Sequence, residues 1–479
     1  MVEKFIAQRL IGKGNVYRIA KPIMRIAIIG TAISVAVMLL TTFIVKGFQK
    51  EIREKIIAFS GHFQINAAQQ FQKNQVNPVH LSDSMLTIIS NMSGVSQVVP
   101  FVQLPGIIEG EESMSGIVLK GIDPNQSSSF LAENLKAGRL LSNDKECVLS
   151  EYITRQLKLE VNDDLFIYAF TEKQHLKPRK LKLVGIYNSG LEDMDKRLSF
   201  VHINLLQQTA KWGLQVVMMY DSSRQSISTK IFGGKSPYRI TWSDSSMLGY
   251  GPHPLPTKRV SVIAHDDVGT LSDTAYFIPP NEVIQGNGSH NAYVGGYEVY
   301  LNDFDQLEKI ENQVYQALPF QAKTSNLYEN FPEIFNWLNM LDVNVALVLI
   351  IMGIVATINL SSTLLILVLE KTQTIGLFKA IGARNKSIRL IFLFQIQHIL
   401  IRGMLFGNLL AFGLGYLQQQ TGILSLNSAS YFINKVPILF DVQNIILINL
   451  VSYFLGMFMM ILPAQLIARI SPVKAIKFN

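Results

Sequence analysis

The stretch VNVALVLIIMGIVATINLSSTLLILVL, residues 343–369, decides the fold class because it carries no charged residue over a length that can cross a bilayer. About 20 apolar residues, rising roughly 1.5 Å each, span the hydrocarbon core. Similar apolar stretches occupy residues 26–48, 388–417 and 444–470. The chain is 48% hydrophobic and only 16% charged, and the apolar excess is concentrated in these stretches. The sequence therefore predicts an α-helical membrane protein with four transmembrane helices.

Lysine and arginine in the short flanks predict the orientation, because cytoplasmic loops are enriched in them. Residues 1–25, 370–387 and 471–479 are all basic, whereas the loop 418–442 contains a single lysine. Both termini and the 370–387 loop are therefore predicted to be cytoplasmic. Residues 49–336 and the 418–442 loop are predicted to lie on the far side. The first apolar stretch is too long for a signal peptide and no A-x-A-like cleavage site follows, so we expect a retained anchor.

Residues 49–336 mix strand-like and helix-like segments, which is typical of an α+β domain. The periodicity of residues 46–57 predicts that the first helix continues beyond the membrane. Residues 221–258 are rich in serine, glycine and proline, and we expect an insertion at about 210–290. The only cysteine, Cys147, excludes an internal disulfide, so the domain must be stabilised by its own core.

The sequence does not predict an enzyme. It contains no HExxH, GxSxG or CxxC motif, and its eight histidines are scattered, so we expect neither a catalytic nor a metal site. Gly12-Lys13-Gly14 lacks the spacing of a phosphate-binding P-loop, so this chain is predicted to bind no ATP by that route. The net charge of +8, without a known module, gives no reason to expect nucleic-acid binding. The apolar stretches contain almost no charge, which argues against a gradient-driven carrier.

The loop after the second apolar stretch, EKTQTIGLFKAIGARNKSIR at residues 370–389, is the strongest functional signal. Residues 370–381 are predicted to form a short helix. Gly382 suits the left-handed position after its last turn, and Asn385 can cap the next helix. Gly376 inside this helix costs roughly 1 kcal/mol relative to alanine, which a close backbone approach would offset. An ordinary amphipathic helix at the membrane interface is the alternative interpretation.

This loop resembles the E-x-x-x-x-I-G-x-x-x-A-x-G-A signature of the FtsX-like (MacB-type) ABC-transporter permeases. The tail LPAQLIARISPVKAIKF resembles the closing segment of the same family. GFQKEIREKI after the first helix, LKGIDP at 119–124 and LSEYITRQLKLEVNDDL at 149–165 resemble the lipoprotein-releasing LolC/LolE permeases. The resemblance covers residues 1–210 and 290–479. It implies a MacB-like periplasmic domain between the first and second of four transmembrane helices in the cell inner membrane.

The resemblance also implies partners. Two permease copies, identical or paralogous, would associate with a separate cytoplasmic ABC ATPase that binds ATP and Mg. The substrate would be a lipoprotein bound for the outer membrane, with transfer to a periplasmic lipoprotein carrier. The hairpin that recruits the carrier in the family would fall in residues 166–183, which are short here. The short helix would contact the ATPase, and the residues assigned to this coupling are Glu370, Thr374, Ile375, Gly376, Lys379 and Gly382.

The outer ends of the first two helices would line a cavity for the acyl chains of the lipoprotein. The candidates lie at helical spacing and are Val37, Leu40, Ile44, Phe48, Leu347, Ile350 and Ile354. They could instead simply face lipid. Arg402 lies within the third apolar stretch, where it either pairs across the bundle or extends to the cytoplasmic interface.

Two other functions remain open. The first is an FtsX-like permease with another output, such as export or control of cell-wall enzymes. The second is a membrane-anchored receptor or enzyme that works without an ATPase.

Overall fold

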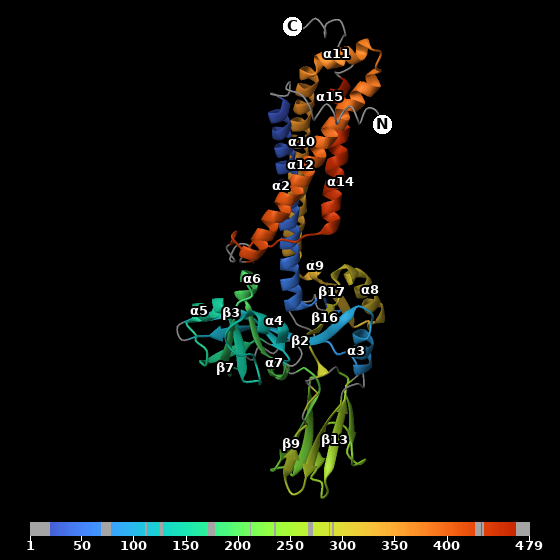
Figure 1. Ribbon diagram of the computed structural model, residues 1–479. Helices are drawn as coiled ribbons and strands as arrows, with labels where there is room; N and C mark the ends of the chain where they lie inside the picture. Colours follow the sequence, from blue (N-terminus) through green and yellow to red (C-terminus); the bar gives the residue numbers. More distant parts are fainter. Residues whose placement is uncertain are drawn as a thin grey trace. The chain divides into compact units, whose positions relative to one another are not determined.

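The computed structural model describes most of the chain. The described residues are 20–68, 78–110, 113–124, 128–170, 178–210, 212–233, 236–266, 272–286, 288–289, 292–426, 433 and 435–465. The chain divides into two compact units (Figure 1). The first, here called the helical unit, comprises Met1–Arg53, Glu333–Asn427 and Ile433–Asn479; the second, here called the α+β unit, comprises Glu54–Pro332 and Ser428–Phe432.

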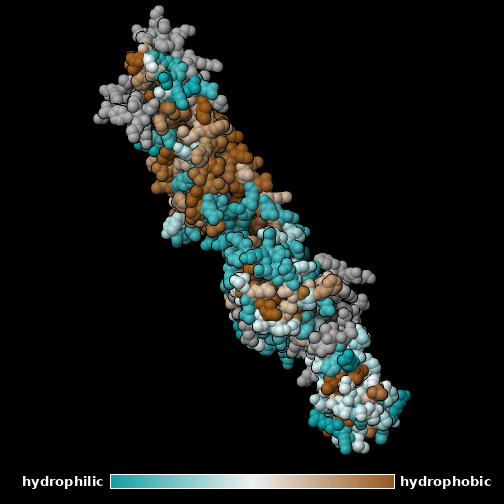
Figure 2. Space-filling model, turned by 90° about the vertical axis from the view of Figure 1, so that its right-hand side faces the viewer, coloured by the Kyte–Doolittle hydropathy of each residue, from teal (hydrophilic) through white to brown (hydrophobic). Residues whose placement is uncertain are grey.

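The helical unit contains, among its described residues, four helices that are long and apolar enough to cross a membrane. They are α2 (Ala20–Ser60), α10 (Pro332–Glu370), α12 (Asn385–Thr421) and α14 (Val442–Met459). About half of the apolar part of α2 and of α12 is buried, against 6% for α10 and 11% for α14. Figure 2 shows apolar side chains gathered in a band over this unit. The helices α2 and α12 therefore form its centre.

Glycines on α12 allow α2 to approach closely. A Cβ atom at Gly403 would lie 2.7 Å from Cβ of Thr31, and one at Gly407 would lie 2.7 Å from the carbonyl oxygen of Ala32. Between apolar helices in lipid, such small residues stabilise the pair by close packing. The contacts also fix the register of the two parallel helices, with Gly403 at the level of Thr31.

Side-chain amides fix the two outer helices. Asn408 of α12 and Asn449 of α14 exchange reciprocal hydrogen bonds of 2.8 and 3.0 Å. On α10, Asn359 Nδ2 donates to the carbonyl oxygen of Ala27 at 3.3 Å. In an apolar bundle each of these bonds satisfies a polar group that has no water partner, and so defines which helix faces pair.

The α+β unit is built on a mixed sheet of ten strands among the described residues. Its strand order is β17-β1-β16-β2-β3-β8-β5-β7-β4, and β6 pairs with β2 and β7. The pairs β3–β8 and β5–β7 are parallel and the others are antiparallel. The strands are β1 (Phe63–Ala67), β2 (Val95–Glu109), β3 (Met114–Ile122), β4 (Leu135–Gly138), β5 (Glu146–Ser150), β6 (Asp164–Ala169), β7 (Pro178–Tyr187), β8 (Leu198–His202), β16 (Gly296–Leu301) and β17 (Ala322–Asn326).

Short helices cover this sheet and close its core. They are α3 (Asp83–Ser90), α4 (Ser128–Asn134), α5 (Glu151–Leu157), α6 (Glu192–Asp195), α7 (Ile203–Ala210), η2 (Phe304–Gln306), α8 (Leu307–Ala317) and α9 (Leu327–Asn330). Side chains from α3, α5, α7 and α8 join the strands in one apolar cluster that includes Cys147. The predicted mixture of strands and helices is therefore confirmed for residues 54–332.

The described residues between 215 and 284 form a separate β-sandwich within this unit. A three-stranded sheet contains β9 (Gln215–Asp221), β10 (Ser226–Phe232) and β12 (His253–Pro254). A four-stranded sheet contains β11 (Arg239–Trp242), β13 (Val260–His265), β14 (Ser272–Ile278) and β15 (Glu282–Ile284). Every second side chain of β13 is buried, in a core of its own that includes Val262 and Phe277. That this segment is an insertion stays a prediction.

The end of α2 is held by a buried ion pair inside the α+β unit. Lys120 Nζ of β3 lies 2.6 Å from Glu298 Oε1 of β16, and both side chains are almost completely buried. The same ammonium group donates to the carbonyl oxygen of Phe59 in the last turn of α2 and lies 4.7 Å from the ring centre of that residue. One cation therefore satisfies a carboxylate of the sheet and a free carbonyl group at a helix end.

Candidate coupling helix and intramembrane cavity

The loop between α10 and α12 contains the predicted short helix, α11 (Thr372–Ala380). Gly382 follows it with φ of +91°, and the N–H of Ala383 donates to the carbonyl oxygen of Phe378 at 2.9 Å. This Schellman arrangement needs a residue without a Cβ atom at the left-handed position, as the sequence predicts for Gly382. The expectation for Asn385 is wrong, because α12 begins at Asn385 itself and Arg384 is the residue that precedes it in extended conformation.

One side of α11 packs inside the helical unit. Ile375 and Gly376 are buried, and Ile375 belongs to an apolar cluster with Ile388 and Phe392 of α12. Thr374 and Lys379 are half-buried. Of the residues assigned to coupling, Ile375 and Gly376 thus position the helix, and they are not available to a partner in this arrangement.

The opposite side of α11 exposes two large apolar side chains one turn apart. Leu377 is 57% and Ile381 is 73% exposed, and Ala380 lies between them. Burial, and next the cation of Arg389, lower the pKa of Lys379 beside this face. Leu377 and Ile381 are not among the residues that the sequence predicts for coupling. Their spacing of four residues places them on one face of the helix, but it does not tell whether that face is exposed.

Glu370 lies at the end of α10, next to α11. Its Oε1 atom is 3.7 Å from Lys371 Nζ, whereas its buried Oε2 atom has no hydrogen-bond partner among the described residues. The carboxylate therefore retains a buried acceptor at the start of the loop.

The seven residues assigned to a lipoprotein cavity differ in how far they are buried in the helical unit. Phe48 is buried and lies 5.5 Å from the ring of Trp337 on α10. Leu347 and Ile350, like Ile354, are more than half exposed on the outer face of α10. Val37, Leu40 and Ile44 are half-buried. A second subunit would be needed to close a cavity over this face, so the assignment stays a prediction.

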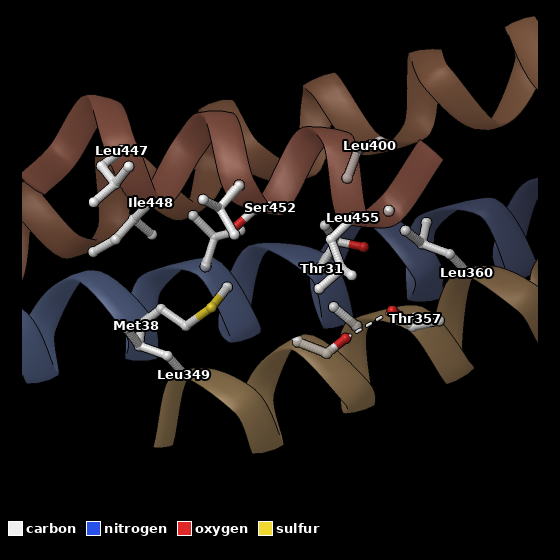
Figure 3. Close-up of a pocket in the computed structure, with 15 residues that line it drawn as sticks. Thr31, Met38, Leu349, Thr357, Leu360, Leu400, Leu447, Ile448, Ser452 and Leu455 are labelled. Carbon is white, nitrogen blue, oxygen red and sulfur yellow. Dashed lines mark hydrogen bonds between the residues drawn. The ribbon is translucent and has the colours of Figure 1, made fainter. Parts of the chain in front are cut away.

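A different cavity lies inside the helical unit, between α10 and α14 (Figure 3). Its volume is about 140 Å³. Thr31 and Val35 of α2 and Leu400 of α12 are buried at its floor, whereas Leu447 and Val451 of α14 are more than half exposed. The cavity is therefore an apolar slot that opens between two weakly buried helices.

The hydroxyl group of Thr31 is the unusual feature of this cavity. Thr31 is completely buried, and its Oγ1 atom has no hydrogen-bond partner among the described residues. Its methyl side packs against Gly403, and the carbonyl oxygen of Ala27, its usual acceptor one turn earlier, receives the amide of Asn359. A buried hydroxyl without an acceptor is costly, which makes the site a candidate for a ligand that supplies one.

The described residues contain no group of three histidine, cysteine, aspartate or glutamate side chains that could hold a metal ion. Cys147 is buried in the sheet core, and this burial raises the pKa of its thiol. Residues 1–19 and 471–479, which are predicted to be cytoplasmic, and residues 171–177 of the predicted carrier-recruiting hairpin lie outside the described residues.

Two known protein families match parts of this chain. Residues 25–230 match the family of MacB-like periplasmic core domains, and residues 346–472 match the FtsX-like permease C-terminal domain. The lipoprotein-releasing system transmembrane protein LolC of Neisseria meningitidis serogroup B is 20% identical over 95% of this chain and 94% of its own length. LolC of Xylella fastidiosa (strain Temecula1) is 25% identical, but over only 38% of this chain and 45% of its own length.

Export proteins are also similar to this chain. The probable export ATP-binding/permease protein MacB of Pseudomonas entomophila is 23% identical over 41% of this chain and 29% of its own length. Among solved structures, the extracellular domain of the noncanonical ABC-type transporter YknZ from Gram-positive bacteria is 12% identical, covering 55% of this chain and 99% of that domain with a TM-score of 0.27. The two matched domains show that this chain belongs to the FtsX-like, MacB-type family of ABC-transporter permeases.

Proposed function

We propose that this chain is the permease subunit of an inner-membrane transporter that extracts lipoproteins for transfer to the outer membrane. A separate cytoplasmic ATPase supplies the energy. α2, α10, α12 and α14 cross the membrane, with both termini and α11 in the cytoplasm and the α+β unit in the periplasm. The similarity to LolC of Neisseria meningitidis along almost the whole chain supports this function.

The substrate explains why such a machine needs ATP. Each buried CH₂ group of an acyl chain contributes about 0.8 kcal/mol to membrane anchoring, so a lipoprotein with several chains does not leave spontaneously. The permease must therefore combine a shelter for the chains with movement driven from outside the membrane. The outward face of α10, with Leu347, Ile350 and Ile354, closes this shelter together with a second permease copy or paralogue.

The exposed side of α11 is the observation on which the coupling proposal rests. Leu377 and Ile381 insert into a groove of the ATPase, while Ile375 transmits the movement to α12. Glu370, Thr374, Lys379 and Gly382 shape the same loop. Two large apolar side chains one turn apart are a common anchor for a helix docked in a groove.

Co-purification tests the partner. An epitope-tagged full chain is isolated from its native membrane, and the recovered proteins are identified by mass spectrometry. Leu377→Glu with Ile381→Glu should reduce ATPase recovery at least about ten-fold, because two carboxylates would be buried in the contact. Leu424→Glu, at an equally exposed leucine outside this loop, is the control and should leave recovery unchanged. Undiminished recovery with the α11 variant would contradict this docking surface.

Reconstitution tests the substrate. Proteoliposomes that contain the chain and its ATPase should release an acylated lipoprotein on addition of ATP and leave a transmembrane-anchored version in place. Release requires a periplasmic acceptor if a carrier takes part. The similarity to proteins named for export favours a second candidate, export of another amphiphile. Failure to release the lipoprotein, with ATPase stimulated by a different compound, would support that alternative.

A further inference from the structure

We infer that the cavity between α10 and α14 binds one acyl chain of a phospholipid from the cytoplasmic leaflet, and that Thr31 donates a hydrogen bond to its ester carbonyl. The inference rests on the orientation of the helices proposed above. The site differs from the predicted lipoprotein cavity, because none of the seven residues assigned to that cavity lines it.

The size and lining of the cavity select a chain-like apolar ligand. A volume of about 140 Å³ is close to the roughly 150 Å³ of an engineered apolar cavity that binds benzene. The lining runs along α2 from Thr31 to Met38, which is roughly 10 Å at the rise of an α-helix. The slot is thus elongated parallel to the helices, as an acyl chain in a bilayer is. Gly353 and Gly456 in its walls leave room for the chain.

The opening of the cavity selects the source of the ligand. The exposed lining residues Leu447 and Val451 lie in the apolar part of α14, so the ligand enters from the lipid phase and not from water. Because lipid tails are as apolar as the lining, hydrophobic transfer gives no selectivity here. Shape and the one unsatisfied donor must provide it.

The position of Thr31 selects the leaflet. Thr31 lies five residues after Ile26, roughly 7 Å from the predicted cytoplasmic end of the apolar stretch. The rest of the slot extends from there toward Met38 and the middle of the membrane (Figure 3). A lipid of the cytoplasmic leaflet that is drawn by this distance into the slot brings its ester carbonyl to Thr31 and lays its chain along the rest of the slot. A chain that entered from the opposite leaflet would bring only its methyl end to Thr31.

Site-specific photocrosslinking tests this binding. A phosphatidylethanolamine that carries a diazirine in one acyl chain is added to membranes that contain the full chain, and after irradiation its adducts at Ser452, which lines the cavity, are mapped by mass spectrometry. Adducts of the same lipid at Phe454, which is 64% exposed on α14, report random contact with the bilayer. We expect a phospholipid adduct at position 452. Gly353→Leu fills the slot beside Leu455, so it should suppress this adduct and leave the adduct at position 454 unchanged.

Thr31→Val keeps the shape of the side chain and removes the donor. It should lower the adduct yield at position 452 about five-fold, the effect of one hydrogen bond. An unchanged yield in Thr31→Val would overturn the assigned orientation of the lipid. No adduct at position 452, or a yield insensitive to Gly353→Leu, would overturn the site. The assay needs neither ATPase nor cargo, so its failure is distinguishable from failure of the proposed function.

Discussion

Replacing Lys120 with methionine should strongly destabilise the α+β unit, because it removes one member of a buried ion pair. Lys120 Nζ lies 2.6 Å from Glu298 Oε1, and the two side chains are 3% and 1% exposed. Methionine retains most of the apolar stem. It leaves the Glu298 carboxylate buried without its cation and the carbonyl group of Phe59 without its donor.

The expected size of the effect follows from this geometry. Removing one partner of a buried pair costs about 3–5 kcal/mol, because the remaining charge stays desolvated. For a unit of this size, each kcal/mol lowers the midpoint of thermal unfolding by about 2–4 °C, so we expect a decrease of about 6–20 °C. Lys120→Met combined with Glu298→Leu removes both charges and should recover most of this loss.

The chain provides its own reporter for the measurement. Cys147 is the only cysteine, and it is buried in the core of the same unit. A thiol-reactive fluorophore therefore follows unfolding of the α+β unit in the detergent-solubilised full chain. Lys180→Met breaks an exposed pair with Asp164 and serves as the control, because exposed ion pairs contribute little to stability. The reasoning fails if Lys120→Met shifts the midpoint no more than the control, or if the double variant is less stable than either single one.

Three further predictions concern other contacts. Hydrogen bonds to Glu146, chiefly from Arg139 and then from Ser142, lower the pKa of its carboxyl group to about 2. The ionised carboxylate therefore stabilises the fold fully at pH values above its ordinary pKa of about 4.3, and this stabilisation is lost as the pH falls through about 2. Glu146→Gln should thus cost about 2–3 kcal/mol at pH 7 and progressively less below pH 4 in tryptophan-fluorescence melts, and a difference independent of pH would contradict this. Gly407→Leu should separate α2 from α12 and lower the thermal midpoint of the helical unit in detergent, whereas Gly413→Leu, where a Cβ atom meets nothing within 4 Å, should not. Asn408→Leu should cost about 1 kcal/mol by orphaning its partner amide on α14, and the pair of leucine substitutions should cost less than twice that.

The sequence predicts well which helices and strands are present, because the patterns that indicate them are local. The apolar stretches predict α2, α10, α12 and α14, and the periodicity of residues 46–57 predicts the extension of α2 to Ser60. The strand-like segments predicted within residues 49–336 include strands such as β5 and β7, and the absence of a Cβ atom predicts the turn at Gly382. Each of these signals lies within a few residues of the feature that it determines.

The faces of the helices could not be predicted in the same way. On α11, apolar residues occur on both sides, so spacing alone does not tell that Ile375 is buried and Leu377 is exposed. In the apolar parts of α10 and α14, apolar side chains occur on every face, so hydrophobic periodicity carries little information about which face is the inner one. The cavity at Thr31 depends on contacts between helices far apart in sequence, through Gly403 and Asn359. No local sequence pattern indicates how α2 is aligned against α10 and α12.

The register also bears on Arg402, for which the sequence leaves two interpretations open. Gly403 contacts Thr31, so Arg402 lies at about the level of Gly30, four residues or roughly 6 Å inside the apolar stretch that begins at Ile26. Its side chain is exposed at the surface of α12. An arginine stem can cover this depth and keep its guanidinium group at the cytoplasmic interface, which avoids the roughly 2.5–3.5 kcal/mol cost of a central charge.

We therefore expect Arg402→Leu to leave membrane insertion and ATPase co-purification unchanged, since leucine only replaces an interfacial cation by another lipid-facing side chain. Arg402→Lys, which also reaches the interface, should behave identically. If instead the guanidinium group paired across the bundle or with another subunit, Arg402→Leu would leave the partner group unsatisfied in lipid, and assembly would be lost. Loss of the complex in Arg402→Leu with normal insertion would thus refute the interfacial position and place Arg402 in a contact between subunits.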